Sequence, residues 1–452
     1  MEISKVGRWW ASETRGEGSS SSGGSTASQA WVPSLDDPAD MPDASFAPNT
    51  RKLDVVVIGA GIAGLAAATA LRHHNVTVLE QSRLKEEIGA AIHLAPNASK
   101  IALKWGLDLD KLGSPEANWY HELGADGNTH FKIPIFAKKE FGAPWLLNHR
   151  VDLHNELKRL ATTEEGPISP ATIRTAAKVI RVDCEEGVVE LQDGEVIKAD
   201  VIVAADGIHS VARTAVLGNQ LVAKRSGHSA YRALIPADIV TSNPRIAHIV
   251  AGDAQGTGLT TYMGPDRRLV AYPCRRSQYL NIVAIVPDSE AEGSTEQWQV
   301  PGRPEQLLES FSAFCDDAKN ILRNVSSCAL WQLREQDPLE TWTKGKVILI
   351  GDAAHAMLPH QGQGGGQAIE DAEALGVFLP SSTSPSSVPE LLKRAEKVRY
   401  ERASLIQGFS RAKALGPREG EKVVNAQEHA QYNFGYNGAK EWAEKMGVEV
   451  PV

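Results

Sequence analysis

A cluster of glycines after a β-branched run is the first place where this sequence predicts chemistry. Gly59, Gly61 and Gly64 follow the apolar run 54–58 and open an alanine-rich stretch. In a strand–turn–helix unit, the first glycine permits a tight turn, the second lets the backbone approach a pyrophosphate, and the third lets the helix pack against the strand. The new helix also offers unpaired N–H groups and the positive end of its dipole to phosphates. The spacing predicts a dinucleotide site, but it does not choose between FAD and NAD(P).

Two acidic residues stand where sugar hydroxyls would need acceptors. Glu80 ends the next apolar run, 21 residues after Gly59, which is the place of a ribose-binding acid in a βαβ unit. Asp352 follows an apolar run, and strands of an α/β sheet bind ligands at their carboxyl ends. The alternatives are a solvated Glu80 and a helix cap at Asp352. His355 beside Asp352 suggests a metal pair, but no further ligand supports it, so we expect no metal.

A glycine-rich segment, 362–366, follows the second of these acids and precedes a stretch with a helical pattern of apolar residues. Gly365 lies within it. Bare backbone at a helix N-terminus can stabilise a phosphate or the anionic edge of a reduced flavin. We therefore expect this segment to contact the same cofactor.

These residues need a framework of alternating strands and helices. Strands are expected at 54–58, 76–80, 199–205 and 346–350, with a helix at 62–73; continuous β-branched runs are typical of parallel strands buried on both faces. Between them, 227–288 contains short β-rich pieces separated by Gly, Pro and Asp, which is typical of an antiparallel sheet. Helical patterns follow at 304–323 and 390–414. The predicted fold class is α/β, with a Rossmann-like FAD-binding domain, an inserted, mainly antiparallel β-sheet substrate domain and C-terminal helices.

The predicted domains follow from these patterns. Residues 1–50 read as a disordered tail, because their Ser, Gly and Pro cannot bury enough apolar area to offset ordering entropy. Segments 51–125, 145–220 and 335–379 form the discontinuous FAD-binding domain, 221–334 the substrate domain, and 380–452 a C-terminal helical region.

Composition excludes several classes of protein. The chain has 452 residues, 42% of them hydrophobic, and a net charge of −9, which argues against global disorder and against nucleic acid as a partner. The longest uncharged apolar run, 55–71, is interrupted by glycines, so no transmembrane segment is expected. The start lacks the apolar segment of a signal peptide, and the four cysteines form no CxxC pair. We expect a soluble, cytoplasmic protein.

Together, the glycine fingerprint, the segment ADVIVAADGIHS (199–210) and the segment GDAAH (351–355) with PHQGQGGGQAIED (359–371) resemble the signatures of class A flavoprotein monooxygenases. This is the family of para-hydroxybenzoate and salicylate hydroxylases, and the resemblance extends from about residue 53 to 436. SAYRALIP (229–236) and MGPDRRLVAYPC (263–274) are most similar to the fungal, salicylate-hydroxylase-like branch, which acts in secondary metabolism.

The resemblance implies an FAD-dependent monooxygenase with NADPH or NADH as a transient co-substrate. Such an enzyme uses O2 to hydroxylate an aromatic or similarly electron-rich small molecule through a flavin C4a-hydroperoxide. It also implies flavin contacts at Arg150 and Ala91, and a role for Asp206 toward FAD and the pyridine nucleotide, with a turn after a strand as the alternative for Asp206. We expect a monomer or a homodimer. The alternatives are an FAD-dependent epoxidase of a terpenoid alkene and a non-catalytic GDI-like binding protein.

For catalysis, the resemblance points to Arg232 and to Tyr262, with Tyr272 as the fallback. An arginine can hold a phenolate by paired N–H bonds. The sequence departs from the family at Ala91, in a segment that commonly reads Gly-Ala-Gly, and at Ala356 and His360. If His360 faces the flavin, it could alter substrate choice.

Overall fold

The computed structural model describes residues 51–84, 91–164, 169–290, 299–415 and 426–451. The tail expected at 1–50 lies outside these residues. Within the described part, no helix has the length and apolar character needed to cross a membrane.

A six-stranded sheet carries the glycine fingerprint. Its strand order is β18-β19-β11-β1-β2-β7, and all neighbouring pairs are parallel except β18 with β19. The strands are β1 (Asp54–Ile58), β2 (Asn75–Glu80), β7 (Thr172–Thr175), β11 (Val201–Ala204), β18 (Thr343–Lys344) and β19 (Val347–Leu349). The four strands expected from β-branched runs are thus confirmed, and their carboxyl ends meet at one edge.

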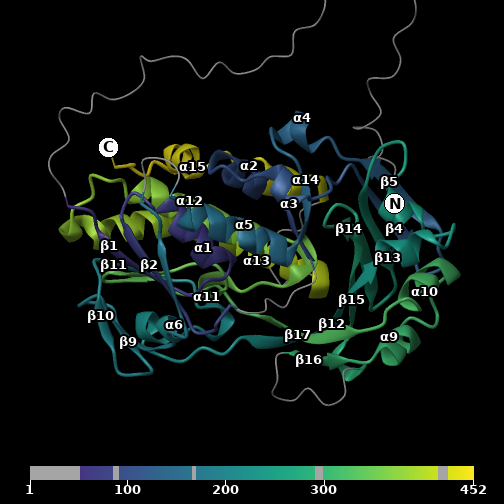
Figure 1. Cartoon of the computed structure of the whole chain (residues 1–452), viewed down its shortest axis with the longest axis horizontal. Coiled ribbons are helices and arrows are strands. Elements are labelled where there is room, and N and C mark those ends of the chain that lie inside the picture. The colour runs from purple at the N-terminus through teal and green to yellow at the C-terminus, as the bar shows by residue number, and fades with distance from the viewer. Residues whose placement is uncertain (1–50, 85–90, 165–168, 291–298, 416–425, 452) are drawn as a thin grey trace, which may run out of the picture. The chain divides into compact units, whose positions relative to one another are not determined.

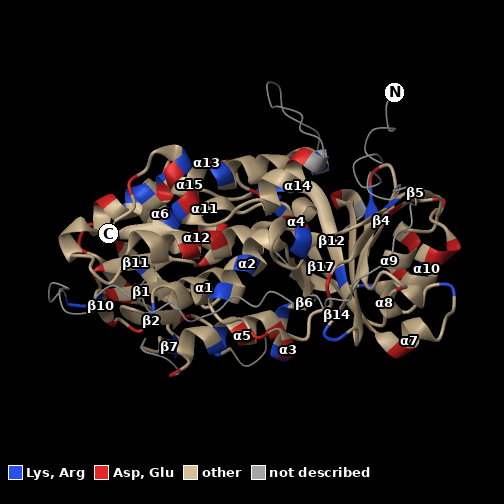
Figure 2. Ribbon diagram, turned by 90° about the horizontal axis from the view of Figure 1, so that it is seen from above, with Lys and Arg blue, Asp and Glu red and all other residues tan. Residues whose placement is uncertain are grey.

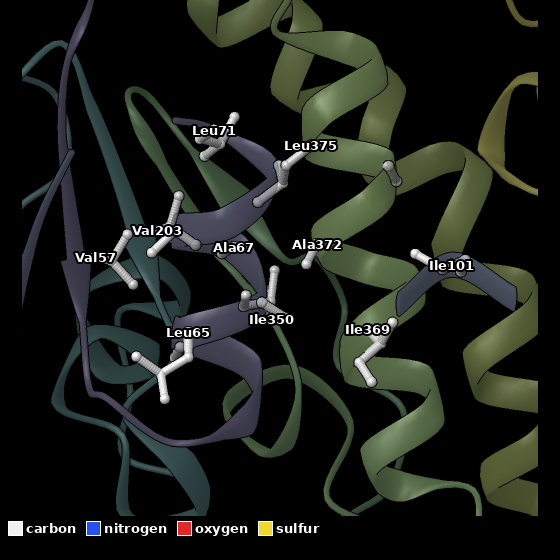
Figure 3. Packing of buried hydrophobic residues seen from close by; sticks show 14 of the residues in the cluster. Val57, Leu65, Ala67, Leu71, Ile101, Val203, Ile350, Ile369, Ala372 and Leu375 are labelled. Atoms are coloured by element: carbon white, nitrogen blue, oxygen red, sulfur yellow. The ribbon is translucent and has the colours of Figure 1, made fainter. Parts of the chain in front are cut away.

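Helices pack on this sheet because their small, apolar faces allow close approach. Helix α1 (Ile62–Ala70) contacts α5 (Arg150–Thr162) and α12 (Gly364–Phe378), and α12 in turn contacts α13 (Val388–Leu415). Figure 3 shows α1, with Leu65 and Ala67, between the strands that carry Val57 and Val203 and helix α12, which carries Ala372 and Leu375; Leu71 directly follows α1. These residues are nearly fully buried, so this layer is the core that fixes the glycine turn.

The second large sheet has eight strands in the order β16-β17-β12-β15-β14-β13-β4-β5. Its neighbouring pairs are antiparallel except β13 with β4, which confirms the mainly antiparallel insertion. The strands are β4 (Trp119–Gly124), β5 (Thr129–Pro134), β12 (Lys224–Pro236), β13 (Gly258–Met263), β14 (Arg268–Cys274), β15 (Tyr279–Pro287), β16 (Gln299–Gly302) and β17 (Cys328–Glu335). Figure 1 shows β13–β15 with α9 (Pro304–Ser310) and α10 (Asp316–Leu322) at the end of the described part that is remote from β1 and β2.

Strand β4 lies in a range that the sequence assigned to the FAD-binding domain, 51–125. It pairs with β13 of the large sheet. The alternation in the sequence could not reveal this, because a parallel partner 139 residues away (Gly258 beside Trp119) leaves no local trace.

The large sheet has two faces with different cover. One face packs on α7 (Ala237–Thr241), α8 (His248–Ala251), α9 and α10. The apolar cluster between them includes Tyr231, Tyr262, Phe311 and Phe314. The other face carries the alternate residues, among them Arg232, Val270 and Tyr272. Because side chains alternate along each strand, neighbours in sequence belong to opposite faces.

The other elements connect these layers, and Figure 2 shows acidic and basic residues interspersed along the helices. The further strands are β3 (Ala91–Leu94), β6 (Leu146–His149), β8 (Val179–Asp183), β9 (Val188–Leu191) and β10 (Val196–Lys198). The further helices are α2 (Pro96–Lys104), α3 (Leu109–Leu112), α4 (Ala137–Phe141), α6 (Val211–Leu217), α7 (Ala237–Thr241), α8 (His248–Ala251), α9 (Pro304–Ser310), α10 (Asp316–Leu322), α11 (Asp352–His355), α14 (Ala426–Phe434) and α15 (Ala439–Met446).

Candidate active site

The glycine turn between β1 and α1 has the geometry that its sequence predicts. Gly59 has φ +96°, and a Cβ there would lie 2.6 Å from the Ala205 carbonyl oxygen. At Gly64 a Cβ would lie 1.9 Å from the Gly59 carbonyl oxygen, so only glycine lets α1 approach. At Gly61 nothing lies within 4 Å of the Cβ position. Two glycines thus serve the fold, while Gly61 leaves backbone open to a ligand.

Glu80 lies beside this turn, at the end of β2. Its Oε2 accepts a 2.8 Å hydrogen bond from the Ala60 N–H, and its Oε1 accepts one of 2.7 Å from the Ser82 N–H. His154 of α5 is 2.7 Å from the Ala60 carbonyl oxygen. Glu80 therefore fixes the turn and stands at the place predicted for the ribose-binding acid.

Asp352 begins α11, directly after β19 and the positive-φ residue Gly351. Its carboxylate makes no hydrogen bond to the described residues and is exposed to solvent. Protein nevertheless surrounds it closely enough that burial raises its pKa, while His355, Arg150 and Arg213 act to lower it. An accessible carboxylate so deep among protein atoms is suited to receive a ligand's hydroxyl groups.

The turn that carries Asp352 is held by a buried carboxylate on α12. Asp371 accepts hydrogen bonds from the Gly351 N–H at 2.9 Å and from Arg399 Nε at 3.0 Å. His355 Nε2 is 2.6 Å from the same carboxylate. His355 therefore pairs with Asp371 and not with Asp352. Among the described residues, no cluster of three or more potential metal ligands occurs.

The glycine-rich segment meets the strand that carries Ala91. Gly362 has φ +62°, and a Cβ there would lie 2.0 Å from the ring of His93; at Gly365 it would lie 2.7 Å from Ile92. Helix α12 starts here without a side-chain cap, so its first N–H groups have no helical partner. Ala91 is 9% exposed at the start of β3. The preceding Gly89 and Ala90 lie outside the described residues.

Asp206 has a local role. Its carboxylate accepts hydrogen bonds from Ser210 Oγ at 2.6 Å and from the Val211 and Ala212 N–H groups at 2.8 and 3.2 Å. Ser210 Oγ in turn accepts from the Arg213 N–H at 2.9 Å. Asp206 thus fixes the start of α6, a local role that fits the turn alternative.

Arg150 and Arg213 lie near Asp352 from two other segments. Arg213 Nη1 donates to the Ala353 carbonyl oxygen at 3.3 Å. Arg150, the first residue of α5, acts electrostatically on both Asp352 and Arg232. Arg150 is therefore near both the acid of the cofactor edge and the arginine of the large sheet.

FAD fits this arrangement on observations of this chain alone. Gly61 leaves space at a helix N-terminus, α12 presents a second uncapped N-terminus, and Asp352 is an accessible acceptor between them. An elongated cofactor with phosphates and many hydroxyl groups matches such donors and acceptors. Gly61, Glu80, Arg150, Asp352 and Gly365 are the residues that would hold it.

Arg232 lies on the face of the large sheet that carries Tyr272. Its Nε is buried without a hydrogen-bond partner, and burial lowers the pKa of its guanidinium. Tyr272 and Arg150 are the ionisable groups that act on it, so no described carboxylate neutralises it. The guanidinium is 5.2 Å from the centre of the Trp331 ring. An unpaired, desolvated cation of this kind favours an anionic ligand.

The structure does not bring Tyr262 to Arg232. The cross-strand row of Arg232 continues through Val283, Val270 and Thr261, whereas Tyr262 belongs to the row of Tyr231. Tyr262 is 3% exposed within the cluster on the opposite face. Because side chains alternate between the two faces along each strand, Tyr262 lies on the face opposite Arg232, which speaks against the expectation for Tyr262. The fallback, Tyr272, shares the face of Arg232.

His93 of β3 is a site residue that sequence reasoning missed. Its ring lies 6.3 Å from that of Tyr272, and its Nδ1 accepts a 3.0 Å hydrogen bond from Trp145 Nε1. Burial and the charge of Lys413 lower its pKa to about 4. His93 is therefore neutral at pH 7, with its proton on Nε2. Its position two residues after Ala91 was the available signal.

Two further buried polar side chains, Asn281 and His360, have side-chain atoms without hydrogen-bond partners among the described residues. Asn281 is fully buried, pairs across the sheet with Tyr272, and both its amide atoms lack hydrogen bonds. His360 is 9% exposed, and neither ring nitrogen has a partner. Burial lowers the pKa of His360 to about 2, so this ring stays uncharged. Since buried polar groups are normally satisfied, they mark a place for a ligand or water.

Comparisons with known proteins identify related flavoproteins. A family model described as an FAD binding domain matches residues 174–410, and one described as an FAD dependent oxidoreductase matches 54–106. The chain is 37% identical to the FAD-dependent monooxygenase cfoG of Aspergillus candidus over 79% of this chain and 84% of that protein. It is 33% identical to hispidin-3-hydroxylase of Neonothopanus nambi over 86% of this chain and 94% of that protein.

Solved structures extend the similarity to the whole fold. A salicylate hydroxylase in complex with its substrate superposes with a TM-score of 0.69 at 29% identity, covering 87% of this chain and 97% of that one. The fold and the cofactor edge therefore define a flavoprotein oxidoreductase. The chain belongs to the class A FAD-dependent monooxygenases, so it is an enzyme that uses FAD, with NAD(P)H as the family's typical co-substrate.

Proposed function

We propose that this monooxygenase hydroxylates a phenol-like aromatic molecule whose ionised oxygen is held by Arg232. The observation that carries the proposal is the unpaired state of this guanidinium, which lies among protein atoms on the sheet face next to Arg150 and Tyr272. A phenolate or another acidic oxygen would supply the missing charge and accept its N–H groups.

The same contact has a chemical consequence. Ionisation makes the ring carbons ortho and para to the oxygen more nucleophilic, and an arginine favours the ionised form without titrating itself. Arg232 would therefore promote reaction as well as binding. Trp331, whose ring lies 5.2 Å from the guanidinium, restricts its position.

Tyr272 and His93 are the proposed partners of Arg232. Burial raises the pKa of Tyr272 well above its ordinary value, so its hydroxyl remains a donor at neutral pH. The Nε2–H of neutral His93 is a second donor. Together they can orient the substrate oxygen and relay its proton.

The cofactor edge supports this role. Gly61, Glu80, Asp352 and Gly365 are proposed to bind FAD, with Arg150 between cofactor and substrate. When bound and reduced by NAD(P)H, FAD activates O2 for transfer of one oxygen atom. The protein holds the substrate next to it and excludes water. The alternative, epoxidation of an isolated alkene, makes no use of an unpaired arginine, because an alkene carries no charge.

Arg232→Gln tests the proposal, with Arg232→Lys as the charge-conserving variant. In the FAD-loaded enzyme, we expect Arg232→Gln to retain FAD but to lose product formation by about 10²-fold or more, with the NAD(P)H consumed ending as hydrogen peroxide. Arg232→Lys should recover part of the coupling. Normal coupled hydroxylation of phenols by Arg232→Gln would overturn the assignment.

A further inference from the structure

Two further cations, Arg268 of β14 and Lys413 of α13, lie near the face of the large sheet that carries Arg232. Arg268 begins β14 and pairs across the sheet with Ile285, which pairs with Ala230 of β12. Arg268 therefore lies two strands from Arg232 and one row further along. From the usual spacing of strands and residues, the two Cα atoms are about 12 Å apart.

Lys413, near the end of α13, lies beside Arg268. Arg268 Nη2 donates to the Lys413 carbonyl oxygen at 3.4 Å, and the next residue, Ala414, packs on the cluster that contains Ala230 and Ile285. The Lys413 side chain is exposed, yet surrounding protein lowers its pKa. It also acts electrostatically on His93 and His360, which border the proposed substrate face.

Neither cation has an ion-pair partner among the described residues. Glu122 is the one described carboxylate that acts on them, and it already accepts hydrogen bonds from Tyr120 at 3.2 Å and lies 3.3 Å from His130. Cations surrounded by protein favour a paired anion, because leaving them unpaired costs solvation free energy.

An uncharged donor points to the same place. His360 is 9% exposed, has no hydrogen-bond partner at either ring nitrogen, and has Arg268, His228 and Lys413 as its charged or titratable neighbours. A neutral imidazole beside two unpaired cations can donate to an anion that they attract.

The surface between the two cationic positions is apolar. Val283 and Val270 lie in the Arg232 row, are partly buried, and border two separate apolar clusters on this face. An aromatic body could lie over these valines while its two ends reach Arg232 and Arg268. A single ring is shorter than the separation of the two Cα atoms and would reach both arginines only if their side chains converged over the valines.

We propose that Arg268, Lys413 and His360 form an anion-binding subsite for a carboxylate or acidic hydroxyl at the far end of the substrate. The inference rests on the proposed function and names its substrate class: an elongated phenol of at least two rings that carries acidic oxygens at both ends. A phosphate of the nicotinamide nucleotide has the same chemistry, so the experiment separates the two sources.

The probes are 4′-hydroxybiphenyl-4-carboxylate and its neutral counterpart 4-hydroxybiphenyl, bound to the oxidised, FAD-loaded enzyme and followed by perturbation of the flavin spectrum. We expect the acid to bind at least about tenfold more tightly than the neutral compound. The double variant Arg268→Gln/Lys413→Gln should abolish this preference. Lys397→Gln, an exposed lysine on the same helix, is the matched control and should retain it.

Two further measurements keep the result decisive. Arg268→Lys should keep most of the preference, and its FAD content reports folding if the double variant is unstable. An unchanged acid preference in the double variant would overturn the inference, as would a rise confined to the KM for NADH or NADPH. Neither result bears on Arg232→Gln, so failure of the subsite and failure of the proposed function are distinguishable.

Discussion

The cofactor edge and the substrate face achieve binding in different ways. At the edge, backbone geometry is complete without a ligand: Gly59 and Gly64 fit their neighbours, Glu80 holds the turn, and Asp371 holds Gly351. On the substrate face, polar groups on regular strands lack partners, notably Arg232, Asn281 and His360. One region is therefore specified by the chain's own contacts, while the other is incomplete until a ligand supplies the missing charge and hydrogen bonds.

The largest expected effect is a loss of stability that distinguishes two glycines of the same turn, Gly64 and Gly61. In Gly64→Ala the new methyl group would lie 1.9 Å from a backbone oxygen, so the free energy of unfolding should fall by about 3 kcal/mol. In Gly61→Ala the methyl group meets no protein atom, so the FAD-free protein should be as stable as the wild type, while FAD binds more weakly. Thermal unfolding and flavin titration check both. Equal loss of stability in the two variants would contradict the division of roles.

The next largest effect, on FAD affinity, is expected from the loss of the Asp352 carboxylate. Asp352→Ala removes an acceptor that the protein itself does not use, so FAD affinity should fall by about tenfold to a hundredfold with little change in folding. Asp206→Ala is the contrasting variant: it removes three hydrogen bonds at the start of α6 and should cost about 1 kcal/mol of stability. Full flavin occupancy and unchanged affinity in Asp352→Ala would show that this acid does not hold FAD.

A smaller effect is expected from tyrosines on the two faces of the sheet. Tyr272→Phe should lower product formation about tenfold while FAD binding stays normal, because a donor beside Arg232 is lost. Tyr262→Phe should change the rate by less than about twofold, since its ring packs in the opposite cluster. Rates of coupled hydroxylation measure both. A greater loss in Tyr262→Phe would reverse the assignment of faces.

The smallest effect is a dependence of stability on pH. His74 and His360 have pKa values lowered by burial to about 4 and about 2, whereas the unfolded chain binds their protons near pH 6.5. The unfolded state therefore binds more protons below that pH, and stability falls with acidification. Between pH 7 and 6 each histidine should cost about 0.7 kcal/mol. Denaturant unfolding at both pH values tests this, and His360→Gln should remove its share of the decline.

Sequence patterns could predict the cofactor edge because the relevant signals are local. Glycine spacing, an acid at a strand end and a bare helix start are each set within a few residues, and the structure places Gly59, Gly61, Gly64 and Asp352 at one edge of the parallel sheet. Such features depend on backbone chemistry that a short window contains.

Local sequence patterns could not predict which side chains share the substrate face. Tyr262 and Tyr272 both lie in short β-rich segments, and only the strand register decides which of them shares a face with Arg232. His93 belongs to the site through a long-range approach to Tyr272 and Gly362. Register and long-range packing are properties of the assembled sheet, so spacing along the chain could not supply them.

The alternation of β12, β14 and β15 also has a consequence for how this enzyme could change its substrate range. Residues such as Tyr231, Ala284 and Leu269 support the core, whereas their neighbours Arg232, Val283, Arg268 and Val270 lie on the other face. Substitutions confined to every second position would therefore vary the lining without disturbing the packing. Adaptation to new molecules, in nature or in a mutant library, should therefore proceed through substitutions on the face of Arg232, whereas substitutions on the opposite face would disturb the core.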